Sequence, residues 1–125
     1  MATESIGPKR LVVGAHYGLG DWLAQRLTAV FLVAYTLIVV VYLVVVVRAN
    51  GALDYEAWAG VFVPLWMKIL TLTAILALLY HAWIGMRDVW MDYVRPTGIR
   101  IGLLLMTILW LIFCAIYAAQ ILWSV

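Results

Sequence analysis

The segment HAWIGMRDVWMDYVRP, from His81 to Pro96, begins at the end of an apolar run. It holds the side chains of this sequence that could do chemistry. His81 lies inside that run, six positions before Arg87, so at ~1.5 Å rise per residue it is roughly 9 Å from the first charge. An ionisable residue in an apolar span is costly and indicates a function with a specific partner. A neutral imidazole there can be a hydrogen-bonded packing residue, a proton relay or an axial ligand of a metal macrocycle.

Gly85 follows His81 by about one helical turn, on the same helical face. A missing side chain there could leave room for a flat group beside the histidine, or it could allow a neighbouring helix to approach closely. Haem ligation and close packing of a hydrogen-bonded histidine therefore both remain open. His16 lies in the polar N-terminal segment, and none of the five Met residues has a position that singles it out as a ligand. If His81 binds haem, we therefore expect the second axial ligand from another subunit.

The residues after Met86 are charged and aromatic. If the helix continues through them, Asp88 and Asp92 lie close to the face that carries His81, within a stripe about 60° wide. Asp92 would then lie ~16 Å from His81 along the helix axis, at or beyond the membrane interface. Tyr93 beside it has two interpretations. Tyrosine is common at membrane interfaces, with Asp92 paired to Arg95 or Arg100. Alternatively, its hydroxyl donates a hydrogen bond to a carbonyl of a lipophilic substrate such as a quinone, while carboxylates and water carry protons.

The elements that must position these side chains are transmembrane helices. Hydrophobic residues make up 68% of the 125 residues, charged residues only 11%, and the mean hydropathy is +1.10. Three apolar stretches, at about 27–47, 66–87 and 101–122, approach the ~20 residues that cross the hydrocarbon core. A lone apolar segment satisfies its backbone in lipid only as a helix, so we predict an all-α membrane protein with three transmembrane helices. Ala-Asn-Gly at 49–51 predicts the end of the first helix, and Pro64 a break before the second.

The distribution of basic residues predicts the orientation of these helices. Lys9, Arg10, Arg26, Arg87, Arg95 and Arg100 lie on one side, against Arg48 and Lys68 on the other. The positive-inside rule then places the N-terminal segment 1–26 in the cytoplasm and the C-terminus in the periplasm. Segment 1–26 lacks the features of a cleaved signal, so the first helix is expected to be retained. The small net charge of +2 is explained by topology and indicates no nucleic-acid partner.

The single cysteine, Cys114, lies in the middle of the third apolar stretch. We expect it to be an inert packing residue, because an apolar environment disfavours the thiolate. One buried cysteine cannot hold an iron-sulfur cluster, so any such centre must belong to another chain.

A family resemblance covers nearly the whole chain and rests on residues 81–86, His-Ala-Trp-Ile-Gly-Met, followed by Asp92-Tyr93-Val94 and Pro96. Gly20-Asp21-Trp22, the stretch 25–29 (Gln-Arg-Leu-Thr-Ala) and the stretch 55–58 (Tyr-Glu-Ala-Trp) extend it. With these residues the sequence resembles the small hydrophobic membrane-anchor subunit of bacterial succinate dehydrogenase. The resemblance implies one membrane-anchor domain over residues 1–125, in the bacterial cytoplasmic (inner) membrane.

The resemblance also implies partners and cofactors. The partners would be a flavoprotein subunit that oxidises succinate, an iron-sulfur subunit and a cytochrome b subunit, with ubiquinone as electron acceptor in the respiratory chain and the tricarboxylic acid cycle. Carried over by residue, His81 would be one axial ligand of haem b, so that the metal is the haem iron, and Arg26 a contact of a haem propionate. Tyr93 would hydrogen-bond ubiquinone, and Asp92 would belong to the polar surroundings of that site.

The resemblance leaves three points open. Arg87-Asp88 is more charged than the family pattern, which indicates either an ion pair within the chain or an added contact to the iron-sulfur subunit. A fumarate reductase anchor that uses menaquinone would have the same architecture. A structural membrane anchor or assembly protein with neither haem nor quinone is the third possibility, in which His81 is a packed core histidine and Tyr93 an interfacial residue.

Overall fold

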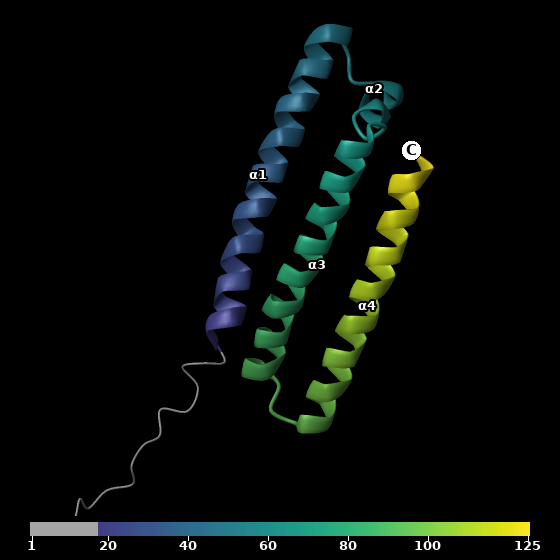
Figure 1. The fold of residues 1–125 in the computed structure, drawn as a ribbon. Helices are drawn as coiled ribbons and strands as arrows, with labels where there is room; N and C mark the ends of the chain where they lie inside the picture. The colour runs from purple at the N-terminus through teal and green to yellow at the C-terminus, as the bar shows by residue number, and fades with distance from the viewer. Residues whose placement is uncertain (1–17) are drawn as a thin grey trace, which may run out of the picture.

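A computed structural model of the chain describes residues 18–125, so the expectations for Lys9, Arg10 and His16 lie outside the described residues. The described part is helical, as predicted. Its elements are α1 (Gly18–Asn50), α2 (Tyr55–Gly60), α3 (Leu65–Tyr93) and α4 (Thr97–Ser124), shown in Figure 1. Of these, α1, α3 and α4 are long and apolar enough to cross a membrane. The three helices contain the three predicted spans and extend beyond them at both ends.

The turn after α1 forms where the sequence predicted a helix stop. Gly51 has a φ of +78°, a left-handed conformation that glycine adopts without a Cβ clash, and its N–H donates to the carbonyl of Val47 at 2.9 Å. Asp54 then caps α2, because its side chain accepts a hydrogen bond from the backbone N–H of Ala57 at 2.8 Å. The segment between α1 and α3 therefore holds one brief capped helix.

Proline residues mark the starts of the two following helices. Pro64 and Pro96 are the N-cap residues of α3 and α4, with extended backbones and no side-chain cap. Between them, α3 runs without interruption through Met86 to Tyr93, and the N–H of Val94 still donates to the carbonyl of Trp90 at 3.2 Å. His81 and Tyr93 consequently lie on one continuous helix, which is the condition under which the sequence placed His81, Asp88 and Asp92 on one face.

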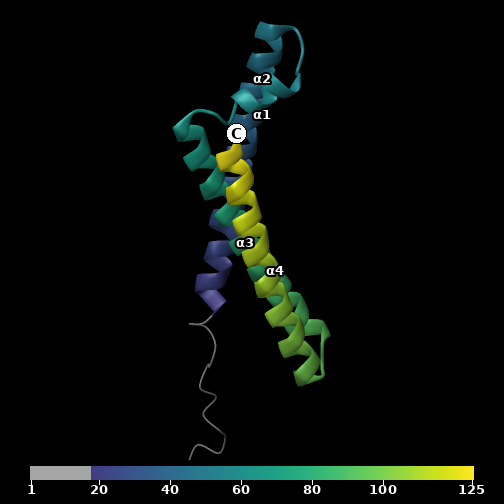
Figure 2. The same ribbon diagram turned by 90° about the vertical axis from the view of Figure 1, so that its right-hand side faces the viewer.

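The long helices form an open row with α3 in the middle. In Figure 1, α1 and α4 flank α3, and the view at 90° in Figure 2 shows that the helices cross at an angle. Both α1 and α4 pack against α3, but among residues 18–125 no Cα atom of α1 comes within 8 Å of one in α4. Within the described residues, any mechanical coupling between α1 and α4 therefore passes through α3.

The row buries few of its own side chains and exposes many apolar ones. No residue of α1 is buried, and in α4 only Thr107 and Leu122 are. Exposed side chains include Leu37, Val41, Leu109 and Phe113, each more than half exposed. Apolar exposure on this scale is stable only against lipid tails or other subunits.

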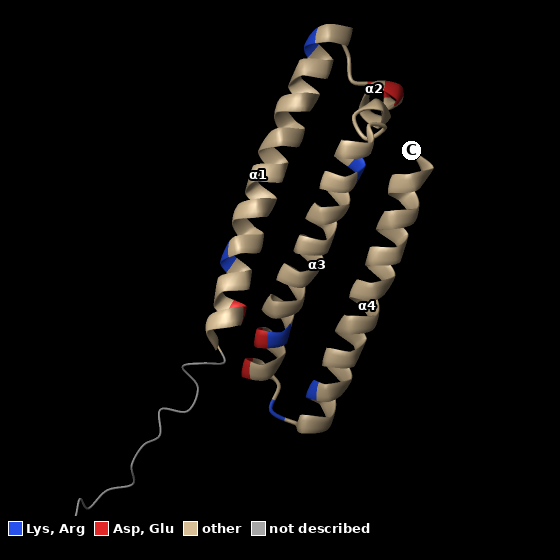
Figure 3. Ribbon diagram, viewed as in Figure 1, with Lys and Arg blue, Asp and Glu red and all other residues tan. Residues whose placement is uncertain are grey.

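Charged residues of the described chain gather toward the two ends of the row, as Figure 3 shows. At ~1.5 Å rise per residue the 33 residues of α1 span roughly 50 Å, longer than the ~30 Å hydrocarbon core. The ends of the helices therefore have room to reach the polar interfaces, and the uncharged middle corresponds to the apolar layer.

Candidate functional site

The imidazole of His81 faces α1. Its Nδ1 lies 3.0 Å from the hydroxyl oxygen of Thr28, across the seam between α1 and α3. The same hydroxyl is 2.7 Å from the carbonyl of Ala24 and 3.2 Å from that of Gln25. His81 itself is half-buried. The histidine is thus hydrogen-bonded on one ring nitrogen, while its Nε2 has no hydrogen-bond partner among residues 18–125.

A side chain of α1 approaches Gly85 on α3. A Cβ built on Gly85 would lie 3.6 Å from the side-chain nitrogen Nε2 of Gln25, which is ordinary van der Waals contact. The amide of Gln25 therefore covers this part of α3. This contact agrees with the close approach of a neighbouring helix at Gly85, whereas room for a flat group beside His81 stays a prediction.

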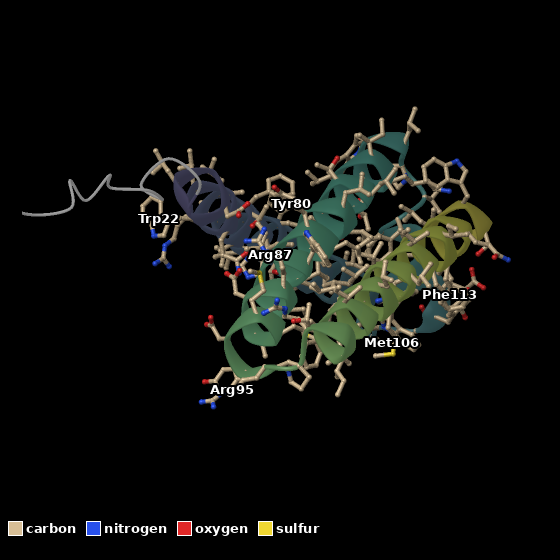
Figure 4. All side chains as sticks on the ribbon, turned by 90° about the horizontal axis from the view of Figure 1, so that it is seen from below. Trp22, Tyr80, Arg87, Arg95, Met106 and Phe113 are labelled. Atoms are coloured by element: carbon tan, nitrogen blue, oxygen red, sulfur yellow. The ribbon has the colours of Figure 1, made fainter. Side chains whose placement is uncertain are left out.

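Arg87 binds two carboxylates within the chain. Its Nη2 donates to Asp21 of α1 at 2.7 Å and to Asp88 at 3.1 Å. Seen from the end of the helices in Figure 4, Arg87 lies between α1 and α3. Of the two roles that the sequence allowed for Arg87-Asp88, the structure shows the ion pair within the chain, with Asp21 as a partner that the sequence did not predict.

A polar notch of about 360 Å³ opens beside this ion pair, between the start of α1 and the last turns of α3. We call it the α1–α3 notch; its lining residues are Gly18, Asp21, Trp22, Gln25, Arg26, Ile84, Arg87 and Asp88. Arg26 is exposed at the notch, and its guanidinium lies 5.5 Å from the ring centroid of Trp22, a cation–π distance. Among residues 18–125, Gln25 Oε1 and Arg87 Nε are buried side-chain atoms without a hydrogen-bond partner. Arg26 therefore lies beside polar atoms that a bound polar group could satisfy.

Tyr93 and Asp92 form the exposed end of α3. The side chain of Tyr93 is 82% exposed, and Asp92 is also exposed. The expected pairing of Asp92 with Arg95 or Arg100 is absent: within the described part of the chain, no cation lies within 4 Å of Asp92. Figure 4 shows Arg95 projecting outward. Tyr93 and Asp92 thus face outward together, free to contact a partner or a substrate.

The structure separates the predicted site residues into two groups. His81 lies in the seam between α1 and α3, with Arg26 nearer the start of α1 at the notch, whereas Asp92 and Tyr93 lie at the end of α3. The contacts of Thr28, Gln25 and Asp21 were not predicted. One signal could have found two of them: Asp21, Thr28 and Tyr35 recur at intervals of seven in α1, and all three make side-chain contacts to α3.

No group of three or more His, Cys, Asp or Glu side chains that could hold a metal ion occurs among residues 18–125. Cys114 is a free, half-buried thiol in α4, which agrees with the expected packing role. A metal bound at His81 would therefore need further donors from a macrocycle or from another chain.

Three long apolar helices in an open row, with a histidine in the central helix and the charges of the described chain toward its ends, define a multi-pass membrane subunit. The chain belongs to the succinate dehydrogenase/fumarate reductase transmembrane subunit family, whose sequence pattern matches residues 2–117. It is 38% identical over 106 residues, 85% of this chain and 89% of the other, to a protein of Coxiella burnetii (strain RSA 493 / Nine Mile phase I) named succinate dehydrogenase hydrophobic membrane anchor subunit. The chain is accordingly a membrane anchor of the inner membrane, which confirms the predicted family.

Proposed function

We propose that this chain anchors a succinate dehydrogenase complex, contributes His81 as one axial ligand of haem b, and presents Tyr93 to ubiquinone. The observation that carries the proposal is the continuity of α3, which holds a half-buried histidine in its apolar part and an exposed tyrosine at its polar end. The name of the Coxiella burnetii relative supports the succinate direction over the fumarate direction.

The residues around His81 suit an axial ligand. An imidazole coordinates through one nitrogen while the other is hydrogen-bonded, and here Nδ1 contacts Thr28 while Nε2 has no partner in the described chain. Arg26 would pair with a haem propionate, which adds a polar group near the α1–α3 notch. Haem b, when bound, would supply one-electron redox chemistry.

The second axial ligand would come from the cytochrome b subunit, because the described residues hold no second histidine. The open row suits this arrangement, since the exposed apolar faces of α1 and α4 need covering by lipid or by another membrane subunit. A flavoprotein and an iron-sulfur subunit would supply the electrons.

Tyr93 would position ubiquinone by donating a hydrogen bond from its hydroxyl to a quinone carbonyl. Reduction to ubiquinol takes two electrons, delivered by the iron-sulfur subunit, and two protons, taken from water near Asp92. The exposure of both side chains supports this role, because neither is committed to a contact within residues 18–125. By the positive-inside rule, this end of α3 would lie on the cytoplasmic side and the C-terminus in the periplasm.

Replacement of His81 tests the haem proposal. In the purified complex, His81→Ala should abolish or shift the reducible b-type optical signal, because the iron loses an axial ligand. Tyr80→Ala, at the neighbouring exposed position, is the control and should keep the signal. A His81→Ala complex with unaltered haem content, spectrum and potential would refute ligation by this residue.

Replacement of Tyr93 tests the quinone proposal. Tyr93→Phe should lower ubiquinone reduction by about tenfold, which is the value of one lost hydrogen bond of roughly 1.4 kcal/mol, while succinate oxidation by an artificial acceptor is retained. Tyr55→Phe, at an exposed tyrosine near the opposite end of the row, should change neither activity. Equal loss of both activities in Tyr93→Phe would contradict a quinone role and indicate faulty assembly.

A further inference from the structure

We infer that Thr28 is a positioning residue for His81: its hydroxyl accepts a hydrogen bond from Nδ1–H, which fixes the ring so that Nε2 is the coordinating nitrogen. The inference deepens the proposed haem ligation and rests on it. It assigns a role to a residue of α1, whereas the ligand itself belongs to α3.

The hydrogen-bond geometry of Thr28 determines which atom donates. A threonine hydroxyl has one proton, and a backbone carbonyl can only accept. The oxygen of Thr28 lies 2.7 Å from the carbonyl of Ala24, the shortest of its three contacts, so its proton points to that carbonyl. The same oxygen then has a lone pair left for the imidazole, and Nδ1 at 3.0 Å must be the donor.

This assignment sets the tautomer of a neutral imidazole. A ring that carries its proton on Nδ1 has its lone pair on Nε2, the nitrogen without a partner in the described chain. A hydrogen bond from the second ring nitrogen also restricts rotation of the ring and raises the basicity of the coordinating nitrogen. Thr28 would therefore affect both how firmly His81 holds the haem and its reduction potential.

The surroundings of Thr28 explain why water would not replace its hydroxyl readily. Thr28 and His81 are both half-buried in the seam between helices, and the amide of Gln25 lies beside Gly85, one turn along α3. If the hydroxyl is removed, Nδ1–H loses its partner inside an apolar layer, where an unpaired donor is unfavourable.

Thr36 provides a matched control on the same helix. Its hydroxyl donates to the carbonyl of Leu32 at 2.8 Å, the same backbone contact that Thr28 makes to Ala24. Thr36 is exposed, and the structure shows no contact of its hydroxyl with a side chain of α3 within the described residues. The pair of threonines thus differs in the contact with His81 and shares the contact within α1.

The experiment compares Thr28→Val, Thr28→Ser and Thr36→Val in the whole purified complex, by haem content per flavin and by redox titration of the haem. Thr28→Val should weaken haem retention by about tenfold. Its potential should become more positive, because a less basic ligand stabilises the ferric state less; a tenfold change in relative affinity equals 59 mV for one electron. Thr28→Ser and Thr36→Val should match the unmodified complex.

Three outcomes would overturn the inference: an unshifted potential in Thr28→Val, an equal shift in Thr36→Val, or a shift in Thr28→Ser, which keeps the hydroxyl. Should Thr28→Val fail to assemble, Thr28→Ala replaces it as a smaller variant without a hydroxyl, and Thr28→Ser still has to retain the original potential. The His81→Ala complex separates this failure from that of the parent proposal. Loss of haem in His81→Ala with no effect in Thr28→Val refutes the positioning role alone.

Discussion

The two seams of α3 differ in how the helices are joined. Against α1, three side-chain pairs cross the seam: Asp21 with Arg87 at 2.7 Å, Thr28 with His81 at 3.0 Å, and Tyr35 with Thr71 at 2.9 Å. Against α4, one hydrogen bond crosses it within the described chain, from Trp90 Nε1 to the Thr107 hydroxyl at 3.0 Å.

Helices in lipid associate through close packing and through hydrogen bonds between helices, because lipid tails remove the usual hydrophobic driving force. In the seam with α1, the three polar pairs are spread along the length of the helices. They therefore fix the register of α1 against α3. The seam with α4 depends more on packing. We conclude that the face of α3 that packs against α1, which carries His81, is held in a defined register against α1.

The ion pair at the end of the first seam gives the largest expected effect on stability. Arg87 and Asp21 are each about one-third exposed, at 29% and 35%, so solvent screening limits their coupling to about 1 kcal/mol. A double-mutant cycle with Arg87→Ala and Asp21→Ala, measured by SDS titration of the full chain in mixed micelles, should give that coupling.

Ionic strength and Asp88 supply the controls for this ion pair. The coupling should decrease in high salt, because both groups are partly exposed. A parallel cycle between Arg87 and the more exposed Asp88, at 58%, should give a smaller value. A coupling with Asp21 of zero at low salt would show that the pair does not hold α1 to α3.

A smaller effect is expected from the hydrogen bond between Tyr35 and Thr71. Hydrogen bonds between membrane helices average about 0.6 kcal/mol, so Tyr35→Phe should destabilise the chain by that amount in the same titration. Thr107→Val, which removes the acceptor of the Trp90 bond, is the matched change on the other seam and should have an effect of similar size. If Thr107→Val were several times more destabilising than Tyr35→Phe, the second seam would be the more strongly held, and the comparison would be reversed.

The sequence predicted the helices well because their causes are local. The apolar runs set the three long helices, while Gly51, Pro64 and Pro96 mark turns through their own backbone preferences. The extension of α3 to Tyr93 follows from the absence of a helix breaker before Arg95-Pro96.

The contacts of the candidate site could not be predicted from the same patterns. Thr28 with His81, Asp21 with Arg87 and Gln25 over Gly85 all depend on the register of α1 against α3, which hydropathy does not encode. The close approach of α1 at Gly85 could not be predicted from the sequence, because the side chain that contacts this position comes from another helix. The role of Tyr93 stays a prediction, since its exposed side chain contacts nothing in the described chain that would test it.

The absence of contact between α1 and α4 has a thermodynamic consequence. Each outer helix interacts with one long neighbour, so the chain behaves as a linear array in which energies add helix by helix. A substitution confined to one seam and a substitution confined to the other should then be additive to within ~0.5 kcal/mol, because the residues share no partner. A destabilising substitution in α4 would affect the environment of His81 only by displacing α3, the helix that carries it.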